Sequence, residues 1–258
     1  MPARVTAFVY GVICYLIFFT TFFYTVGFVG DLTAPKSIDS GPQSAPASAL
    51  LIDACLLGLF AAQHSLMAQQ WFKRAWTRIV PEPVERSTYV LVSSLALLLL
   101  FWQWRPMGVA VWSLENQAGQ LAIYALYFFG WLLLVASISM IDYFDLFGLR
   151  QVWRYLHGHR QSLINSRTPG PYQRIRHPIY LSWLIIFWAT PRMTAAHLIL
   201  ALATTAYIFL AIQFEERDPI RFFGDDYRRR RGQASMTFSL RLPKRKSREF
   251  ISERQMNA

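Results

Sequence analysis

Several polar side chains in this sequence could do chemistry, and the densest group lies just before a short apolar run. Arg174, Arg176 and His177 precede Pro178, and Tyr180 follows two residues later. Proline suits the first turn of a helix, where its missing N–H is not needed. The open N–H groups at such a helix start, with the basic side chains beside them, can bind a carboxylate or a phosphate. The alternative is that the arginines only anchor the helix at a membrane interface.

A pair of glutamates, Glu215 and Glu216, ends the last apolar run of the sequence. Acids at a helix C-terminus oppose the helix macrodipole, so the pair favours a cationic partner nearby. A short hairpin between the last two apolar runs would bring Arg176 and His177 close to it. The alternative is a charge cluster that balances other arginines at the interface.

Two aspartates and one histidine are candidates for proton transfer. Asp142 and Asp145 are three residues apart in a run rich in Phe, Tyr and Leu, so on a continuous helix they share a face. They could equally belong to an interfacial aromatic belt, with Arg150 as an ion-pair partner. His64 is the lone imidazole of an apolar run, where it either bridges two helices or acts as a ligand or base.

The composition indicates which elements must position these groups. Of the 258 residues, 54% are hydrophobic and 16% are charged, whereas an ordinary soluble domain carries about 25% charged residues. This composition argues against a water-soluble enzyme. The candidate membrane helices are residues 5–30, 49–68, 88–104, 119–141, 178–191 and 194–214. The sequence predicts an all-α, polytopic membrane bundle of five to six helices.

The fifth of these runs is shorter than the roughly 20 residues that a membrane crossing needs. It either crosses obliquely, stops partway, or pairs with the sixth run as a tight hairpin through residues 190–192. Residues 33–48, rich in Pro, Ser and Ala, are expected to form an extended loop between the first two helices. Asp53 lies in the second run, far from the other candidates, and receives no functional assignment.

The distribution of the basic residues indicates how the chain is oriented in the membrane. Lys and Arg number 26 against 15 acids, a net charge of +11, which by itself would also suit nucleic-acid binding. When alternate loops are placed on opposite sides, 23 basic residues fall on one face, and only Lys36, Arg105 and Arg192 fall on the other. The positive-inside rule then predicts that both termini are cytoplasmic. The aromatics lie mainly in the apolar runs, so no nucleic-acid partner is expected.

The chain divides into three expected parts. Residues 1–168 hold the first four helices, 169–241 form a cofactor-binding hairpin with the segment that follows, and 242–258 form a basic, disordered tail. Cys14 and Cys55 lie in apolar runs and form no ligand pattern, so neither a disulfide framework nor a metal site is expected.

Residues 176–180 (Arg-His-Pro-Ile-Tyr), followed by Glu215-Glu216 and by residues 223–227 (Phe-Gly-Asp-Asp-Tyr), resemble the C-terminal signature of the integral-membrane methyltransferases. These include isoprenylcysteine carboxyl methyltransferase, the phospholipid methyltransferases and the NnrU-like proteins. The resemblance covers residues 170–231. It implies S-adenosylmethionine as the methyl donor, bound in a pocket that faces the cytoplasm and is made by the last helical hairpin.

Two further elements are similar to the bacterial methanethiol S-methyltransferases, and this likeness spans nearly the whole chain. They are residues 63–65 (Gln-His-Ser) and residues 142–151, which begin with Asp142 and include Asp145. The likeness implies an enzyme of the bacterial plasma membrane that converts methanethiol to dimethyl sulfide on the cytoplasmic side. Pro219 and Arg230 depart from the family pattern, where an aliphatic residue and a tyrosine are usual.

The chemistry of the donor and the resemblance together imply the site residues. Basic groups and the helix start would bind the donor carboxylate, the glutamates its ammonium or ribose hydroxyls, and the tyrosines its adenine. The expected cofactor-binding residues are Tyr172, Arg174, Arg176, His177, Pro178, Tyr180, Glu215, Glu216 and Tyr227. The candidates for a base that ionises the thiol are Asp142, Asp145, His64 and Tyr180. Among these we favour the aspartate pair.

Two alternatives remain open at this point. The first is a methyltransferase of the same architecture whose acceptor is a prenylcysteine carboxylate or a phospholipid amine. The second is a membrane protein without catalytic activity, of NnrU type, or a small transporter. The expected partners are the small thiol and the lipid bilayer, without an obligate protein partner.

Overall fold

The structure of the chain is a computed structural model that describes residues 1–32, 34–139, 147–158 and 178–231, with side chains described up to residue 213. Five helices are long and apolar enough to cross a membrane. They are α1 (Pro2–Val29), α2 (Pro46–Ala68), α4 (Glu82–Gln103), α5 (Gln117–Ser139) and α9 (Ala195–Arg231), of which Ala195–Gln213 is the apolar part. The predicted all-α membrane bundle is confirmed.

Three shorter helices and two strands complete the described ranges. The helices are α3 (Gln70–Trp76), α7 (Leu149–Leu156) and α8 (Pro178–Trp188). The strands β1 (Ala110–Ser113) and β2 (Arg192–Thr194) pair antiparallel, with Ala110 opposite Thr194 and Ser113 opposite Arg192. The small sheet ties the connection between α4 and α5 to the turn between α8 and α9.

The fifth apolar run stops partway and forms a hairpin with the sixth. Helix α8 has 11 residues, about 16 Å of helix, whereas the hydrocarbon core of a bilayer is about 30 Å thick. It packs between α5 and α9. Gly130 of α5 permits the close approach, since a Cβ there would lie 3.0 Å from the side chains of Ile185 and Ile186.

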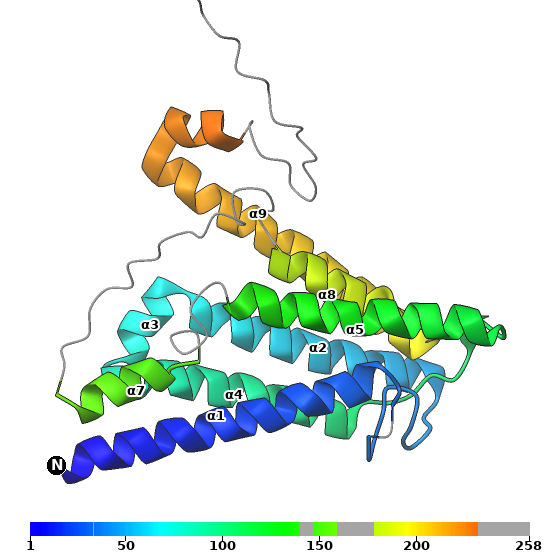
Figure 1. Ribbon diagram of the computed structural model, residues 1–258, viewed down its shortest axis with the longest axis horizontal. Helices are drawn as coiled ribbons and strands as arrows, with labels where there is room; N and C mark the ends of the chain where they lie inside the picture. Colours follow the sequence, from blue (N-terminus) through cyan, green and yellow to red (C-terminus); the bar gives the residue numbers. More distant parts are fainter. Residues whose placement is uncertain (33, 140–146, 159–177, 232–258) are drawn as a thin grey trace, which may run out of the picture.

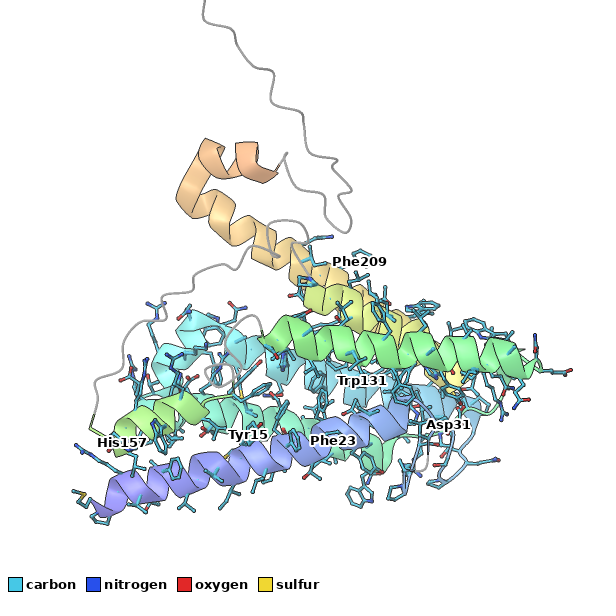
Figure 2. All side chains as sticks on the ribbon, viewed as in Figure 1. Tyr15, Phe23, Asp31, Trp131, His157 and Phe209 are labelled. Atoms are coloured by element: carbon cyan, nitrogen blue, oxygen red, sulfur yellow. The ribbon has the colours of Figure 1, made fainter. Side chains whose placement is uncertain are left out.

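The long helices lie side by side and define two ends of the molecule (Figure 1). One end carries the N-terminus, α3 and α7, and we call it the α3/α7 end. The other carries β1, β2 and residues 30–45, and we call it the sheet end. His157 and Asp31 mark the two ends in Figure 2. The last part of α9 extends away from the bundle and changes direction, and Pro219 lies in this part.

The densest apolar packing lies toward the sheet end. Trp104 is fully buried, and Tyr127 of α5 donates a hydrogen bond of 2.6 Å to the carbonyl oxygen of Val26 near the end of α1. The side chain of Trp131 on α5 contacts α1, where its ring centroid lies 5.1 Å from that of Phe22 (Figure 2). These contacts fix the helices relative to one another at the end remote from α3 and α7.

Residues 30–45 form a hydrogen-bonded cap over the sheet end, and the predicted extended loop is shorter because α2 begins at Pro46. Lys36 Nζ donates hydrogen bonds of 2.6 and 2.9 Å to the carbonyl oxygens of Trp102 and Trp104. The last carbonyls of a helix have no partner within it, and a cation there also complements the macrodipole. Trp104 Nε1 donates in return to the carbonyl oxygen of Ile38, at 3.1 Å.

The charged side chains at the sheet end are partly buried, and several make hydrogen bonds. Asp53 is fully buried, and its Oδ1 accepts a hydrogen bond of 2.9 Å from the backbone N–H of Arg105. This carboxylate, which the sequence left without a role, therefore holds the chain where it leaves α4. Burial lowers the pKa of Lys36, and the charge of Arg105 adds to this effect. Burial likewise raises the pKa of Asp39, which accepts a hydrogen bond from Thr194.

Replacement of the capping lysine tests this arrangement. We expect Lys36→Met to lower the free energy of unfolding by about 1 to 3 kcal/mol, because two carbonyls at the end of α4 lose their donor. Thermal unfolding of the purified protein in detergent, followed by tryptophan fluorescence, measures the change. Lys73→Met on α3 is the matched control and should unfold like the unsubstituted protein. Equal midpoints for both variants would contradict the capping role.

Candidate functional site

The α3/α7 end gathers the helix ends that adjoin the predicted chemistry. Because neighbouring spans run in opposite directions, this end receives the C-termini of α2 and α5 and the N-terminus of α4, and α8 starts close to it (Figure 1). Residues 140–146 follow α5 directly, and residues 159–177 join α7 to α8. The acidic run, the basic group before Pro178, and His64 near the end of α2 are therefore attached to elements at one end of the bundle.

A polar cluster joins α2 to α4 inside this end. Tyr89 Oη lies 3.1 Å from both ring nitrogens of His64, and Ser93 Oγ lies 3.4 Å from His64 Nδ1. Tyr89 and Ser93 are four residues apart, so both side chains point from the same face of α4 toward α2. The ring of Phe60 stacks on that of His64, with ring centroids 5.4 Å apart.

The same cluster reaches α9. Ser65 Oγ and Tyr207 Oη are 2.9 Å apart, a hydroxyl pair that joins α2 to α9. Gln63 Nε2 donates to Ser93 Oγ at 3.3 Å and approaches the sulfur of Met67 at 3.1 Å. Gln63 Oε1 is buried and accepts no hydrogen bond from the described residues. The cluster therefore offers hydroxyl, imidazole and amide groups between three spanning helices.

Arg86 carries a positive charge at the outer edge of the cluster. The guanidinium carbon of Arg86, one turn before the Tyr89 ring on α4, lies 5.8 Å from the centroid of that ring. This is within the range of a cation–π interaction.

Asp142 and Asp145 lie outside the described residues, but the element that follows them is held firmly. Phe147 stacks on Phe18 of α1, with ring centroids 4.1 Å apart. Gly148 has φ +83° and lies against Ser87 on α4. Phe147 and Gly148, which follow the acidic run in the sequence, are thus held next to α1 and the start of α4.

The anion-binding group is described only from Pro178 onward; Tyr172, Arg174, Arg176 and His177 lie outside the described residues. Pro178 is buried at the first position of α8, and its carbonyl oxygen accepts a hydrogen bond of 2.8 Å from Ser182 Oγ. Tyr180 is half-buried one turn inside. The N–H groups of the first turn of α8 have no acceptor within the helix and can meet an anion.

The glutamate pair lies on the last part of α9, where the backbone is helical and side-chain positions are not described. Glu215 and Glu216 follow Tyr207 by about two turns, and Tyr227 lies three turns further on. The structure therefore continues one helix from the hydroxyl pair at Ser65 into the predicted donor-binding segment.

Sequence reasoning found His64 but missed Tyr89, Ser93 and Tyr207. Each of them lies in an apolar run, where a serine hydroxyl usually bonds within its own helix and a tyrosine near a helix end is typical of an interfacial aromatic belt. The available signal was the four-residue spacing of Tyr89 and Ser93 on a helix that must face another span. Which span it faces follows only from the packing of α4 against α2.

Enlargement of Gly148 tests the link between α7 and the site. A Cβ at this position would lie 2.9 Å from the backbone nitrogen of Ser87, and φ +83° strains any other residue. We expect Gly148→Ala to lower both thermal stability and methyl-donor affinity, because residues 142–147 lose their anchor. Gly58→Ala, where a Cβ meets nothing within 4 Å, should change neither. Unaltered donor affinity in Gly148→Ala, measured by calorimetry, would refute the link.

Comparison with known proteins identifies the family. The chain is 49% identical over 234 residues to methanethiol S-methyltransferase of Crocosphaera subtropica, which covers 91% of this chain and 92% of the relative. It is 46% identical over 233 residues to methanethiol S-methyltransferase of Mycobacterium tuberculosis, covering 90% and 96%. Nurim of Mus musculus is 34% identical over 179 residues, covering 66% and 68%.

No protein-family model matches the chain, and no solved structure matches it. The assignment therefore rests on the sequence relatives alone. Two of them are nearly half identical to this chain and span about nine-tenths of it and of their own length. The chain belongs to the methanethiol S-methyltransferase family.

Proposed function

We propose that the protein methylates methanethiol to dimethyl sulfide, with S-adenosylmethionine as the methyl donor. The observation that carries this proposal is the family membership, because relatives that align over nine-tenths of the chain are named for this reaction. The polar cluster between α2, α4 and α9 supports it, since thiol methylation needs polar groups in a site that excludes water. The acceptor is small and apolar and can enter or leave through the bilayer.

The donor site is proposed at the α3/α7 end. The described residues fit an amino-acid carboxylate in one respect, because the first turn of α8 presents open N–H groups close to this end. His177, Arg174 and Arg176 would complete the anion site. Glu215 and Glu216 would bind the ammonium or the ribose hydroxyls. When bound, the donor supplies an electrophilic methyl group.

Tyr172, Tyr180 and Tyr227 are the proposed adenine contacts. In the proposed division of the chain, residues 169–241 carry the donor and residues 1–168 carry the acceptor. Helix α8 supports this division, because it is too short to span and packs against both α5 and α9.

The acceptor must lose its proton before or during attack, since the thiolate is the nucleophilic form. The pKa of an alkanethiol lies above the roughly 8.5 of cysteine, so a base contributes. The candidates are Asp142, Asp145, His64 and Tyr180. The enzyme must also align donor and acceptor, which makes the reaction effectively unimolecular.

The reaction is proposed for the cytoplasmic side of the bacterial plasma membrane, with both termini on that side. The distribution of basic residues supports this orientation. In the described part of the chain, Lys36, Arg105 and Arg192 lie at the sheet end, and the other basic residues with described side chains, such as Arg4, Lys73 and Arg86, lie toward the α3/α7 end.

An acceptor panel tests the activity. Purified protein with S-adenosylmethionine should form dimethyl sulfide from methanethiol, detected by gas chromatography. It should leave a prenylcysteine and phosphatidylethanolamine unmethylated. A prenyl or acyl chain would need a lateral slot between helices, whereas a site built for a small acceptor needs none. Donor binding without methyl transfer to any thiol would contradict the proposal. Transfer only to the prenylcysteine or the lipid would assign another acceptor to the same fold.

Thiol labelling tests the orientation. In a chain carrying Cys55→Ala, Gln43→Cys at the sheet end should react with a membrane-impermeant maleimide added to intact cells. Thr77→Cys, just after α3, should react only after the cells are opened. Gln43 and Thr77 are both exposed, so accessibility within the protein is matched. The opposite pattern would place the α3/α7 end outside the cell.

A further inference from the structure

We propose that Tyr89 and His64 form a proton relay for the acceptor thiol, in which Tyr89 Oη contacts the sulfur and His64 receives the proton. The inference rests on the proposed function and names the acceptor side of the same site. It assigns a role to Tyr89, which no pattern in the sequence singled out. It also chooses among the candidate bases on the geometry of described residues.

The geometry places Tyr89 in front of the imidazole. Tyr89 Oη is 3.1 Å from Nδ1 and 3.1 Å from Nε2 of His64, so the hydroxyl lies within hydrogen-bond distance of both ring nitrogens. Phe60 covers a face of the ring. A thiol that approaches from the α4 side therefore meets Tyr89 Oη before it meets His64.

The cluster lies inside the membrane-spanning part, but near its edge. His64 is four residues from the end of α2 and Tyr89 is seven residues from the start of α4, about 6 and 10 Å of helix. Both side chains are half-buried. A thiol that arrives from the bilayer can therefore reach the relay, while the donor arrives from the nearby helix ends.

The proton steps balance as follows. The thiol S–H bond breaks and its proton moves to Tyr89 Oη, while the Tyr89 hydroxyl proton moves to a nitrogen of neutral His64. The thiolate sulfur forms a bond to the methyl carbon, and the bond from that carbon to the donor sulfur breaks, with its electron pair staying on the donor sulfur. One positive charge disappears from the donor sulfonium and one appears on His64, which releases its proton to water at the α3/α7 end.

Arg86 contributes to the step at Tyr89. Its guanidinium lies 5.8 Å from the Tyr89 ring and stabilises negative charge that develops on the phenol oxygen. The same positive charge disfavours a lasting imidazolium, so His64 passes its proton on after the transfer. Ser93 Oγ, 3.4 Å from Nδ1, holds the ring in place.

The relay is coupled mechanically to the donor segment. The hydroxyl pair of Ser65 and Tyr207 joins the residue after His64 to α9, at 2.9 Å. Eight residues further along α9 is Glu215, about 12 Å of helix. One continuous helix thus links the acceptor cluster to the proposed donor site.

Acceptors of different acidity test the relay. Tyr89→Phe and His64→Gln should each lower kcat for methanethiol by about 100-fold or more, the lower range for general acid–base catalysis. With 2,2,2-trifluoroethanethiol, a small thiol that ionises more readily, both variants should lose much less, because less proton transfer is needed. Affinity for S-adenosylmethionine, measured by calorimetry, should stay unchanged in both variants and so reports intact folding.

Tyr10→Phe is the matched control, since Tyr10 makes an equivalent hydroxyl contact of 3.0 Å to Thr88, the neighbour of Tyr89 on α4. It should retain full activity with both thiols. Equal losses with both thiols in Tyr89→Phe would mean a purely structural role and would overturn the relay. Rescue by the acidic thiol in Asp145→Asn, but in neither relay variant, would assign the base to the aspartates. An unsubstituted protein that methylates no thiol would overturn the proposed function itself.

The unsubstituted protein provides a second measurement that needs no variant. Methanethiol turnover under single-turnover conditions should be slower in deuterium oxide, because two protons move with the bond change. The effect should shrink with trifluoroethanethiol. An equal solvent isotope effect for the two thiols would contradict the relay.

Discussion

Hydrocarbon provides no hydrogen-bond partners, so the backbone polar groups of a spanning segment must be satisfied within the protein, and an unpaired polar side chain there is costly. This constraint explains the sheet end, where the last carbonyls of α4 receive the Lys36 ammonium and the buried Asp53 accepts the N–H of Arg105. It also explains why Thr21 and Thr25 of α1 bond back to carbonyls of their own helix. With these groups paired, the apolar core can pack tightly around Trp104.

The opposite end obeys the same constraint with different chemistry. There the polar side chains pair between helices, as His64 does with Tyr89 and Ser65 with Tyr207. Interhelical pairs of this kind are less permanent than backbone capping, because a side-chain hydroxyl or imidazole can exchange its partner for a substrate. In the proposed function, the capped sheet end holds the fold while the polar side chains of the α3/α7 end are available to the substrate.

Composition and hydropathy were sufficient to predict the architecture, because a spanning helix must be long and apolar. They predicted α8 as too short, and its packing against α5 depends on the close approach at Gly130. The site was predicted only in part. His64 stands out as a lone imidazole, but Tyr89 and Tyr207 become functional candidates only once packing sets α4 and α9 against α2. The cap at residues 30–45 also escaped prediction, since its bonds depend on the distant Trp102 and Trp104.

The central claim is that donor and acceptor meet at the α3/α7 end, beside Tyr89. An experimental structure of the protein with S-adenosylhomocysteine and a bound alkanethiol tests it most directly. The account predicts the nucleoside between the start of α8 and the last part of α9, with the thiol sulfur in hydrogen-bond contact with Tyr89 Oη. A ligand bound at the sheet end, or a thiol remote from α2 and α4, would contradict the account.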